Sequence, residues 1–322
     1  MGLARSSPGS VLFTTYNVLD LGAGDPAAAA GHYATVAESI RALRTDVLAV
    51  QEICAPGLPA ARALLRQLAD DTGLRCLVPG PGGEVVPALC PGSRGYHLGL
   101  LWRDGIEPVP GSFHGGSAGF WHGLGWVTLD VGGPAVRHAV YHASPFGRKI
   151  RADQSEIVVA SRARTGGPGR PVPALVGADW NGESADRIRD PATGRWELYE
   201  PGDPYAGVDW FDQLVYQCEW DYDQRGQRRH RADRRPGDVL WAGGLHDVAA
   251  ALRAPWQPTA GHHPDDSYGA RGISRRIDGI RVTAPLLSSL RAYAVEDTEL
   301  TRAASDHLPV TVEYVPSAMA RG

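Results

Sequence analysis

The segment PALVGADWNG, residues 173–182, is the stretch that decides the fold of this chain. It begins as an apolar run and ends in two polar side chains, Asp179 and Asn181, which are separated by Trp180. A short apolar run that stops at polar residues is typical of a buried strand. Successive side chains of a strand point to opposite faces, so Asp179 and Asn181 should project to the same side. The segment therefore predicts a buried strand that delivers two polar groups to one place.

Further apolar segments along the chain also lead to polar side chains. They are VLFTTYNV (11–18) with Asn17, DVLAVQE (46–52) with Glu52, RHAVYHA (137–143) with His142, and LPVTVEYV (308–315), which follows Ser305, Asp306 and His307. Phosphoester hydrolysis needs a metal held by oxygen ligands, an activated water and donors for the charge on the phosphoryl oxygens. Carboxylates, amides and imidazoles at strand ends suit these tasks. Each residue alone also has an ordinary structural explanation, so the inference depends on the ordered set.

The remaining regular segments indicate the fold class. Further strands are predicted at GLLWR (99–103), GWVTLDV (125–131) and RIDGIRV (276–282), and helices at residues 33–44, around 64–68 and at 151–164. The neighbouring strands 125–131 and 137–143 could pair as a hairpin. Strands that alternate with helices and also include such a hairpin predict an α/β sandwich with mixed sheets. We interpret residues 1–322 as a single domain.

An irregular insert is predicted at about 183–275, because this stretch is rich in Arg, Asp, Trp, Gly and Pro and has little periodicity. Its basic run at 225–235 could be an arm for an anionic substrate or a solvated loop balanced by nearby acids, and both interpretations stay open. The cluster at 262–266 contains potential metal ligands, but its spacing specifies no metal site. Trp121, Trp210 and Trp220 lie in Gly- or Asp-rich loops and could line a pocket for a base-like group.

Composition limits the class of partner and the compartment. A net charge of -4 and a pI near 6.3 argue against a protein that grips a long nucleic acid through its bulk charge. No signal peptide or membrane span is recognisable, and the dominance of arginine over lysine is typical of GC-rich bacterial coding, so we expect a bacterial, cytoplasmic protein without an obligate protein partner. The cysteines are expected to be reduced, with a disulfide between Cys76 and Cys90 as the alternative.

The ordered set of polar residues resembles the endonuclease/exonuclease/phosphatase superfamily, also called DNase I-like. The matching positions are Asn17, Gln51-Glu52, His142, Arg151 and Gln154 in the following helix, Asp179-Trp180-Asn181, Asp278, and Ser305-Asp306-His307. The resemblance runs from about residue 11 to residue 315. It implies a four-layered α/β sandwich, in which two facing mixed β-sheets are flanked by helices.

The resemblance also implies a role for each matching residue. Asn17, Glu52 and Asp306 would hold Mg²⁺ or Mn²⁺, and Asp179 would contribute while positioning the nucleophile. His307 would act on the attacking water, oriented by Asp278, because an acid behind a histidine fixes its tautomer. Asn181 and His142 would donate to the phosphoryl oxygens. Arg151, Tyr96 and His97 are expected to contact the substrate.

Three positions depart from the family pattern. Gly177 stands two residues before Asp179 instead of one. The sequence Ala-Ser-Pro-Phe-Gly follows His142, where one apolar residue is commoner. Gly279 follows Asp278 where a large residue is usual, and it could open space beside His307.

We therefore expect a divalent-metal-dependent phosphoesterase, most simply a phosphodiesterase, whose substrate is a phosphorylated small molecule or a nucleic acid. Two alternatives remain. The same fold and metal site could be redirected to acid-base chemistry on a small metabolite, or the chain could be a catalytically silent binding module.

Overall fold

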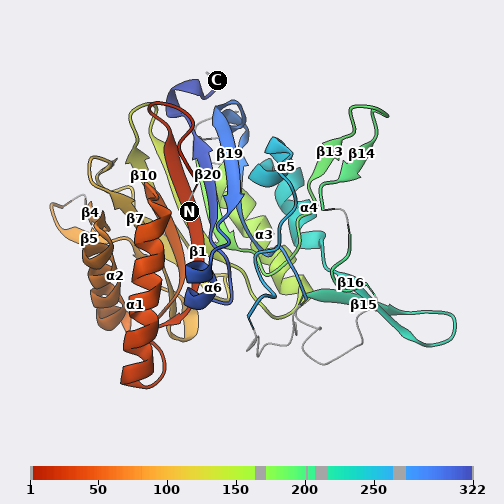
Figure 1. Cartoon of the computed structure of the whole chain (residues 1–322), viewed down its shortest axis with the longest axis horizontal. Helices are drawn as coiled ribbons and strands as arrows, with labels where there is room; N and C mark the ends of the chain where they lie inside the picture. The colour runs from red at the N-terminus through yellow and green to blue at the C-terminus, as the bar shows by residue number, and fades with distance from the viewer. Residues whose placement is uncertain are drawn as a thin grey trace.

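The computed structural model describes residues 3–80, 82–163, 172–200, 202–206, 217–263 and 273–320. Within this part of the chain two seven-stranded sheets face each other (Figure 1). The first sheet has the order β19 (Leu290–Val295), β20 (Val310–Tyr314), β1 (Val11–Leu21), β2 (Val47–Cys54), β7 (Tyr96–Arg103) and β3 (Leu74–Arg75), with β6 (Leu89–Cys90) paired to β7. The second has the order β17 (Leu245–Asp247), β18 (Asp278–Thr283), β12 (Ala174–Asp179), β11 (Val136–His142), β10 (Gly123–Asp130) and β8 (Glu107–Pro108), with β9 (His114–Gly116) paired to β10.

Both sheets are mixed. Strands β1 and β2 pair in parallel, as do β11 and β12, whereas β12 and β18 are antiparallel. The predicted hairpin is present, because β10 and β11 are antiparallel neighbours joined directly along the chain. Each strand predicted from an apolar run is found, with its ends shifted by up to three residues.

The main core lies between the two sheets. Apolar side chains such as Phe13, Trp102 and Val140 fill it and are fully buried. The sheets approach closely at Gly177, where an added Cβ would lie 2.8 Å from the Cβ of Thr15 on the facing sheet. Any side chain at residue 177 would therefore push the sheets apart beside the site, which gives this glycine a packing role.

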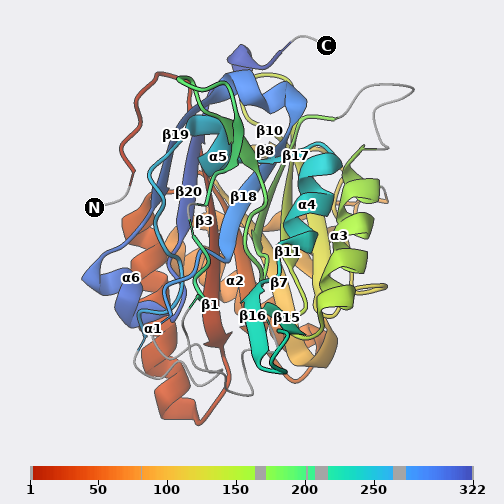
Figure 2. The same cartoon turned by 90° about the vertical axis from the view of Figure 1, so that its right-hand side faces the viewer.

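Helices cover both outer faces (Figure 2). Helices α1 (Pro26–Leu43) and α2 (Leu58–Thr72) pack their apolar stripes on the first sheet, while α3 (Arg148–Ala163) and α4 (Arg235–Ala242) cover the second. The short helices are α5 (Val248–Leu252), which lies against β19, and α6 (Glu299–Ala304), which lies against α1. The predicted four-layered sandwich of two mixed sheets flanked by helices is confirmed.

Helix α1 begins earlier than its apolar spacing predicts. The side chain of Asp25 accepts hydrogen bonds from the backbone N–H groups of Ala27 and Ala28, and Pro26 occupies the first helical position. Both features are favourable at a helix start. The four alanines that follow carry no apolar periodicity, which is why the pattern of buried residues did not reveal this turn.

The insert at about 183–275 is more regular than its sequence predicts. It contains the hairpins β13 (Arg187–Arg189) to β14 (Trp196–Leu198) and β15 (Cys218–Tyr222) to β16 (Arg228–Ala232), together with α4, β17 and α5. Short, polar hairpins bury little apolar surface, so their strands lack the signal on which sequence analysis depends. The other small hairpin, β4 (Leu77–Pro79) to β5 (Val85–Pro87), lies outside the insert, and 3-10 turns occupy Ser93–Gly95, Ala284–Ser289 and Pro316–Ala318.

The basic run at 225–235 forms much of the β15–β16 hairpin. Arg231 pairs with Glu219 across the two strands, and Arg229 pairs with Asp223. These pairs support the interpretation that nearby acids balance this face of the run.

The cysteines are free thiols, so the alternative Cys76–Cys90 disulfide is not formed. Among the described helices, none combines the length and the apolar character that crossing a bilayer requires. Trp210 and residues 265–266 lie outside the described residues.

Candidate active site

The site begins at the end of β12, where strand register gathers three of the expected residues. Asp179, the last residue of β12, is the register partner of His142 on β11 and of Asp278 on β18. One of the three therefore comes from each of three adjacent strands of the second sheet. The Nε2 atom of His142 lies 3.3 Å from the Oδ2 atom of Asp179.

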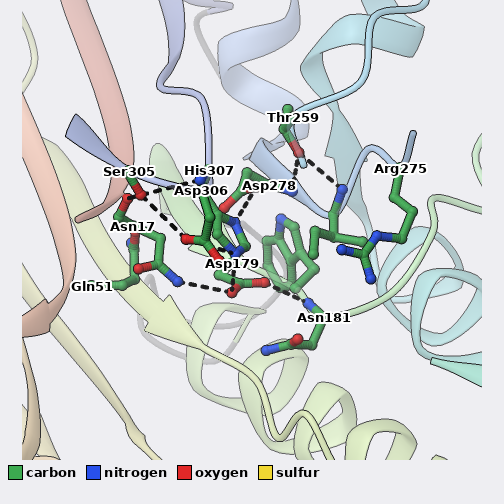
Figure 3. A network of polar contacts seen from close by, with 12 residues as sticks. Asn17, Gln51, Asp179, Asn181, Thr259, Arg275, Asp278, Ser305, Asp306 and His307 are labelled. Atoms are coloured by element: carbon green, nitrogen blue, oxygen red, sulfur yellow. Dashed lines mark hydrogen bonds and ion pairs between the residues drawn. The ribbon is translucent and has the colours of Figure 1, made fainter. Parts of the chain in front are cut away.

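The facing sheet contributes Asn17 and Glu52 from the adjacent strands β1 and β2. The Nδ2 atom of Asn17 lies 2.9 Å from Oε1 of Glu52. It also lies 3.1 Å from Oδ2 of Asp179, so this amide joins the two sheets across the site (Figure 3). Its Oδ1 atom accepts a hydrogen bond from the backbone N–H of Leu19. In this arrangement Asn17 donates to the carboxylates.

Glu52 is placed by an irregularity in its strand. The register of β2 shifts against both β1 and β7 beside this residue, and the φ angle of Glu52 is 69°. A positive φ is uncommon for a residue with a side chain and is tolerated where the surroundings enforce it. The backbone N–H of Asp20 donates to Oε2 of Glu52 at 3.0 Å and helps to fix the carboxylate.

Asn181 reaches the site by a different route from the one expected. Strand β12 ends at Asp179, and Asn181 has a φ angle of 47°. Its backbone N–H donates to Oδ1 of Asp179, while its side chain donates from Nδ2 to the carbonyl of Ala143. Trp180 turns away into an apolar cluster and donates from Nε1 to the carbonyl of Gly279. The two polar residues are thus brought together by a left-handed turn and not by strand alternation.

The last motif adds a histidine and acid pair. The Nδ1 atom of His307 lies 2.8 Å from Oδ2 of Asp278, and its Nε2 atom lies 4.0 Å from both Asp179 and Asp306 (Figure 3). The hydroxyl of Ser305 donates to the carbonyl of Asn17 and accepts from the backbone N–H of His307, which ties this loop to β1.

The start of β18 is held by Thr259, a residue of the insert. Its hydroxyl oxygen accepts hydrogen bonds from the backbone N–H groups of Ile277 and Asp278, at 3.1 and 3.0 Å (Figure 3). Asp278 therefore has a fixed backbone as well as a fixed side chain.

The charges in the site strongly affect one another. Although burial opposes it, the imidazoles of His307 and His142 hold the pKa of Asp179 well below its usual range. Burial also opposes protonation of His307, but Asp278 and Asp306 raise the pKa of that imidazole well above its ordinary value. Burial raises the pKa of Glu52. The site is therefore built of imidazoles that favour their protonated form beside a carboxylate that favours its ionised form.

The chain shares this architecture with solved structures. It superposes on an endonuclease/exonuclease/phosphatase family protein from Bacteroides thetaiotaomicron with a TM-score of 0.55 and 18% identity, covering 94% of each chain. This is the DNase I-like fold. Similar superpositions are found for mannosyl-6-phosphatase from Bacteroides thetaiotaomicron (TM-score 0.56, 16% identity, 94% and 98% covered) and truncated TDP2 from Caenorhabditis elegans (0.56, 14%, 95% and 98%). No protein-family model matches the sequence, and no curated protein matches it.

In this DNase I-like chain the donor set fits a divalent cation. Within the described residues, Asp179, Asp278 and His307 present ligand atoms that all lie within 4.8 Å of one another. Glu52 lies beside them, and Oδ1 of Asp278 is buried with no hydrogen-bond partner. Hard carboxylate oxygens are the ligands preferred by Mg²⁺ and Mn²⁺.

The residues expected to contact the substrate are partly or fully buried in this structure. Arg151 is fully buried, where it donates to the carbonyl of Pro145 and pairs with Asp233 at 3.2 Å. His97 is also buried and accepts a hydrogen bond from the backbone N–H of Gly92. Neither side chain is exposed in this structure, and we propose that both support the loops around the site. Tyr96 is half-buried and packs edge-on against His122.

His122 and Gln217 join the site without having been anticipated from the sequence. His122 stacks on His142 with ring centroids 3.9 Å apart, and burial lowers its pKa to about 2. Gln217 donates from Nε2 to the Oδ1 of Asn181 at 3.0 Å. Both residues stand in loops without periodicity, and no sequence signal could have identified them beyond the aromatic residues next to His122.

Gly279 borders open space, as expected, but this space does not lie beside His307. Gly279 borders a pocket whose described lining includes Trp180, Arg276 and Asp278. Neither His307 nor Asp179 is among the described residues that line this pocket, so the pocket does not open the space between them.

Proposed function

We propose that this protein is a divalent-metal-dependent phosphoesterase that hydrolyses a phosphodiester by attack of water. The observation that carries the proposal is the convergence of Glu52, His142, Asp179, Asp278 and His307 from two facing sheets onto one site. An amide, carboxylates and two imidazoles supply in one place the ligands, the proton acceptor and the donors that phosphoryl transfer requires.

Glu52 and Asp306 would hold the cation, with Asp179 contributing. The alternative centre of Asp179, Asp278 and His307 would require His307 to share or break its 2.8 Å bond to Asp278, so we assign that pair to proton transfer. Asn17 fixes the carboxylates of Glu52 and Asp179 through its Nδ2 atom and would become a ligand only if its amide turned over. When bound, Mg²⁺ or Mn²⁺ would neutralise charge on the phosphoryl oxygens.

His307 is assigned to proton exchange with the attacking water. The bond from Nδ1 to Asp278 fixes the ring, so that Nε2 faces Asp179. Asp179 would orient the water in front of Nε2, because its carboxylate stays ionised and accepts hydrogen bonds. A cation bound beside Asp179 would oppose the positive charge that these carboxylates favour on His307 and would lower the pKa of its ring. The neutral ring could then take the proton of the water, and Asp278 would stabilise the imidazolium that forms.

Two donors would stabilise the phosphoryl oxygens. His142 directs Nε2 into the site and is held there by the stacked ring of His122. Asn181 uses one N–H of its side-chain amide for the carbonyl of Ala143, which leaves the other for a phosphoryl oxygen. Donors held in place before the reaction lower the barrier because they need no reorganisation.

The substrate is proposed to be a nucleic acid or a phosphorylated small molecule. The fold is shared with mannosyl-6-phosphatase, a name that denotes a phosphomonoesterase, so a fair test must include both ester classes.

The decisive experiment measures hydrolysis of phosphodiester and phosphomonoester substrates with Mg²⁺, Mn²⁺ or EDTA. Asp179→Ala and His307→Ala should each lower turnover at least a hundredfold, whereas His114→Ala, at an exposed histidine on β9, should not. Activity that survived EDTA and both substitutions would refute the proposal. Metal binding without phosphoester hydrolysis would favour acid-base chemistry on a metabolite, and neither binding nor turnover would favour a silent module.

A further inference from the structure

An arginine stacks on a tryptophan on one side of the site. The guanidinium of the exposed Arg94 lies 4.1 Å from the ring centroid of Trp121, whose ring in turn packs edge-on against Phe146 at 5.2 Å. Trp121 directly precedes His122, the residue stacked on His142. Trp121 is therefore the chain neighbour of a residue that contacts His142 in the site.

A second stack of the same kind involves Arg148, two residues after Phe146. The guanidinium of Arg148 lies 4.3 Å from the ring centroid of Trp220 on strand β15. Gln217, three residues before Trp220, donates to Asn181 in the site. At about 3.3 Å per strand residue, Trp220 stands roughly 10 Å from that contact.

Buried bonds hold the two stacks in place. Phe146 lies in the unusual segment after His142, Arg148 begins helix α3 directly after that segment, and Arg151 donates to the carbonyl of Pro145 within it. The same guanidinium pairs with Asp233 at the base of the β15–β16 hairpin. Arg151 thus connects the segment that carries Phe146 to the hairpin that carries Trp220, so buried bonds support the residues of both stacks.

We propose that Arg94, Trp121, Phe146, Arg148 and Trp220, the arginine–tryptophan rim, bind the nucleotides of a short single-stranded oligonucleotide that flank the phosphodiester in the site. This proposal rests on the proposed function and names its substrate class. Aromatic faces stack with nucleobases, and guanidinium groups pair with the phosphates between them.

The chemistry of the rim favours this occupant over others. A neutral sugar needs hydrogen-bonding side chains such as Asp and Asn, whereas the rim offers planar and cationic groups. A long duplex is disfavoured by the net charge of -4. Tyr222, two residues beyond Trp220 on the same face of β15, is 63% exposed and lies about 7 Å further along the strand, where it could continue the row of rings.

The test is calorimetric titration of tetrathymidylate into the full-length His307→Ala protein in EDTA, which separates binding from hydrolysis. Trp121→Ala and Trp220→Ala should each weaken the Kd about 5- to 100-fold, because each removes one stacking surface. Trp220→Phe should recover most of the affinity, since it keeps a ring. The matched control is Trp196→Ala, which removes a 63% exposed tryptophan from β14 and should leave the Kd unchanged.

Each outcome has a defined meaning. Unchanged affinity in both alanine variants would overturn the rim, as would equal loss of affinity for mannose 6-phosphate, which would identify a sugar platform. Tight binding that depends on the rim, in a wild-type protein that hydrolyses no phosphoester, would support the rim and refute the proposed function. Hydrolysis of other phosphoesters without oligonucleotide binding would refute the rim alone.

Discussion

The Nδ1 atom of His307 lies 2.8 Å from Oδ2 of Asp278, and this bond decides which nitrogen of the ring faces the site. Asp278 is in turn fixed by Thr259 through its backbone, and it is the register partner of Asp179 on the next strand. The orientation of the histidine is thus set by the sheet itself.

Replacing Asp278 with Asn should therefore lower kcat roughly a hundredfold or more and change KM by less than about threefold. The amide can keep the position of the ring, but it no longer stabilises the imidazolium. Steady-state kinetics of Asp278→Asn beside Asp153→Asn, at an exposed acid on α3, measures the effect. An unchanged kcat would remove the pair from the mechanism.

Metal binding should be visible as stability, independently of activity. At a hundred times its Kd, Mg²⁺ should contribute about 2.7 kcal/mol to the free energy of unfolding, and EDTA should remove this contribution. The Glu52→Gln variant should lose most of the stability that Mg²⁺ adds, because it lacks the carboxylate beside Asn17 and Asp179. Without metal, the variant should be as stable as the wild type or more so, since it lacks one of several crowded acids. Urea unfolding with and without Mg²⁺ tests both statements, and a full gain in the variant would exclude Glu52 as a ligand.

The revised role of Arg151 predicts a loss of stability. Both partners of its pair with Asp233 are fully buried, and Arg151→Met would leave that carboxylate with the half-exposed Arg235 as its remaining charged partner, so the substitution should destabilise the protein by about 1–3 kcal/mol. Arg187→Met, which breaks a partly exposed pair with Asp238, should cost less than about 1 kcal/mol. Denaturant unfolding of the two variants measures both losses of stability. Normal stability with a raised KM would instead restore Arg151 as a direct substrate contact.

His138 should make stability depend on pH, away from the site. It is buried between the sheets, where Nε2 lies 2.9 Å from the hydroxyl of Tyr314, and burial lowers its pKa to about 3. The unfolded chain binds a proton near pH 6.5, whereas the folded protein does not, so stability falls as pH drops below 6.5. Between pH 7 and pH 5 the wild type should lose about 2 kcal/mol more than His138→Gln. Equal losses measured by urea unfolding would show that His138 titrates normally.

Local sequence patterns indicated the α/β class and its strands, and the ordered set of polar residues implied the four-layered sandwich and the candidate site through its resemblance to the superfamily. Apolar runs with β-branched residues indicate the strands, because residues of these types fit a buried sheet. Polar residues of the candidate site stand at or near the ends of these runs. Asn17, His142 and Asp179 could be anticipated for this reason. The hairpins of the insert could not, because short polar strands bury too little surface to leave a pattern.

Only the tertiary structure decided how these residues meet. The irregularity that turns Glu52 inward and the left-handed turn at Asn181 depend on neighbouring strands, so their positive φ angles have no signature in the local sequence. The burial of Arg151 depends on Asp233, 82 residues away. The rim joins loops that are distant in the chain. The sequence by itself thus determined which chemical groups are present and on which strands, while long-range packing decided their orientation, because the free energy of these contacts is gained only when the two sheets come together.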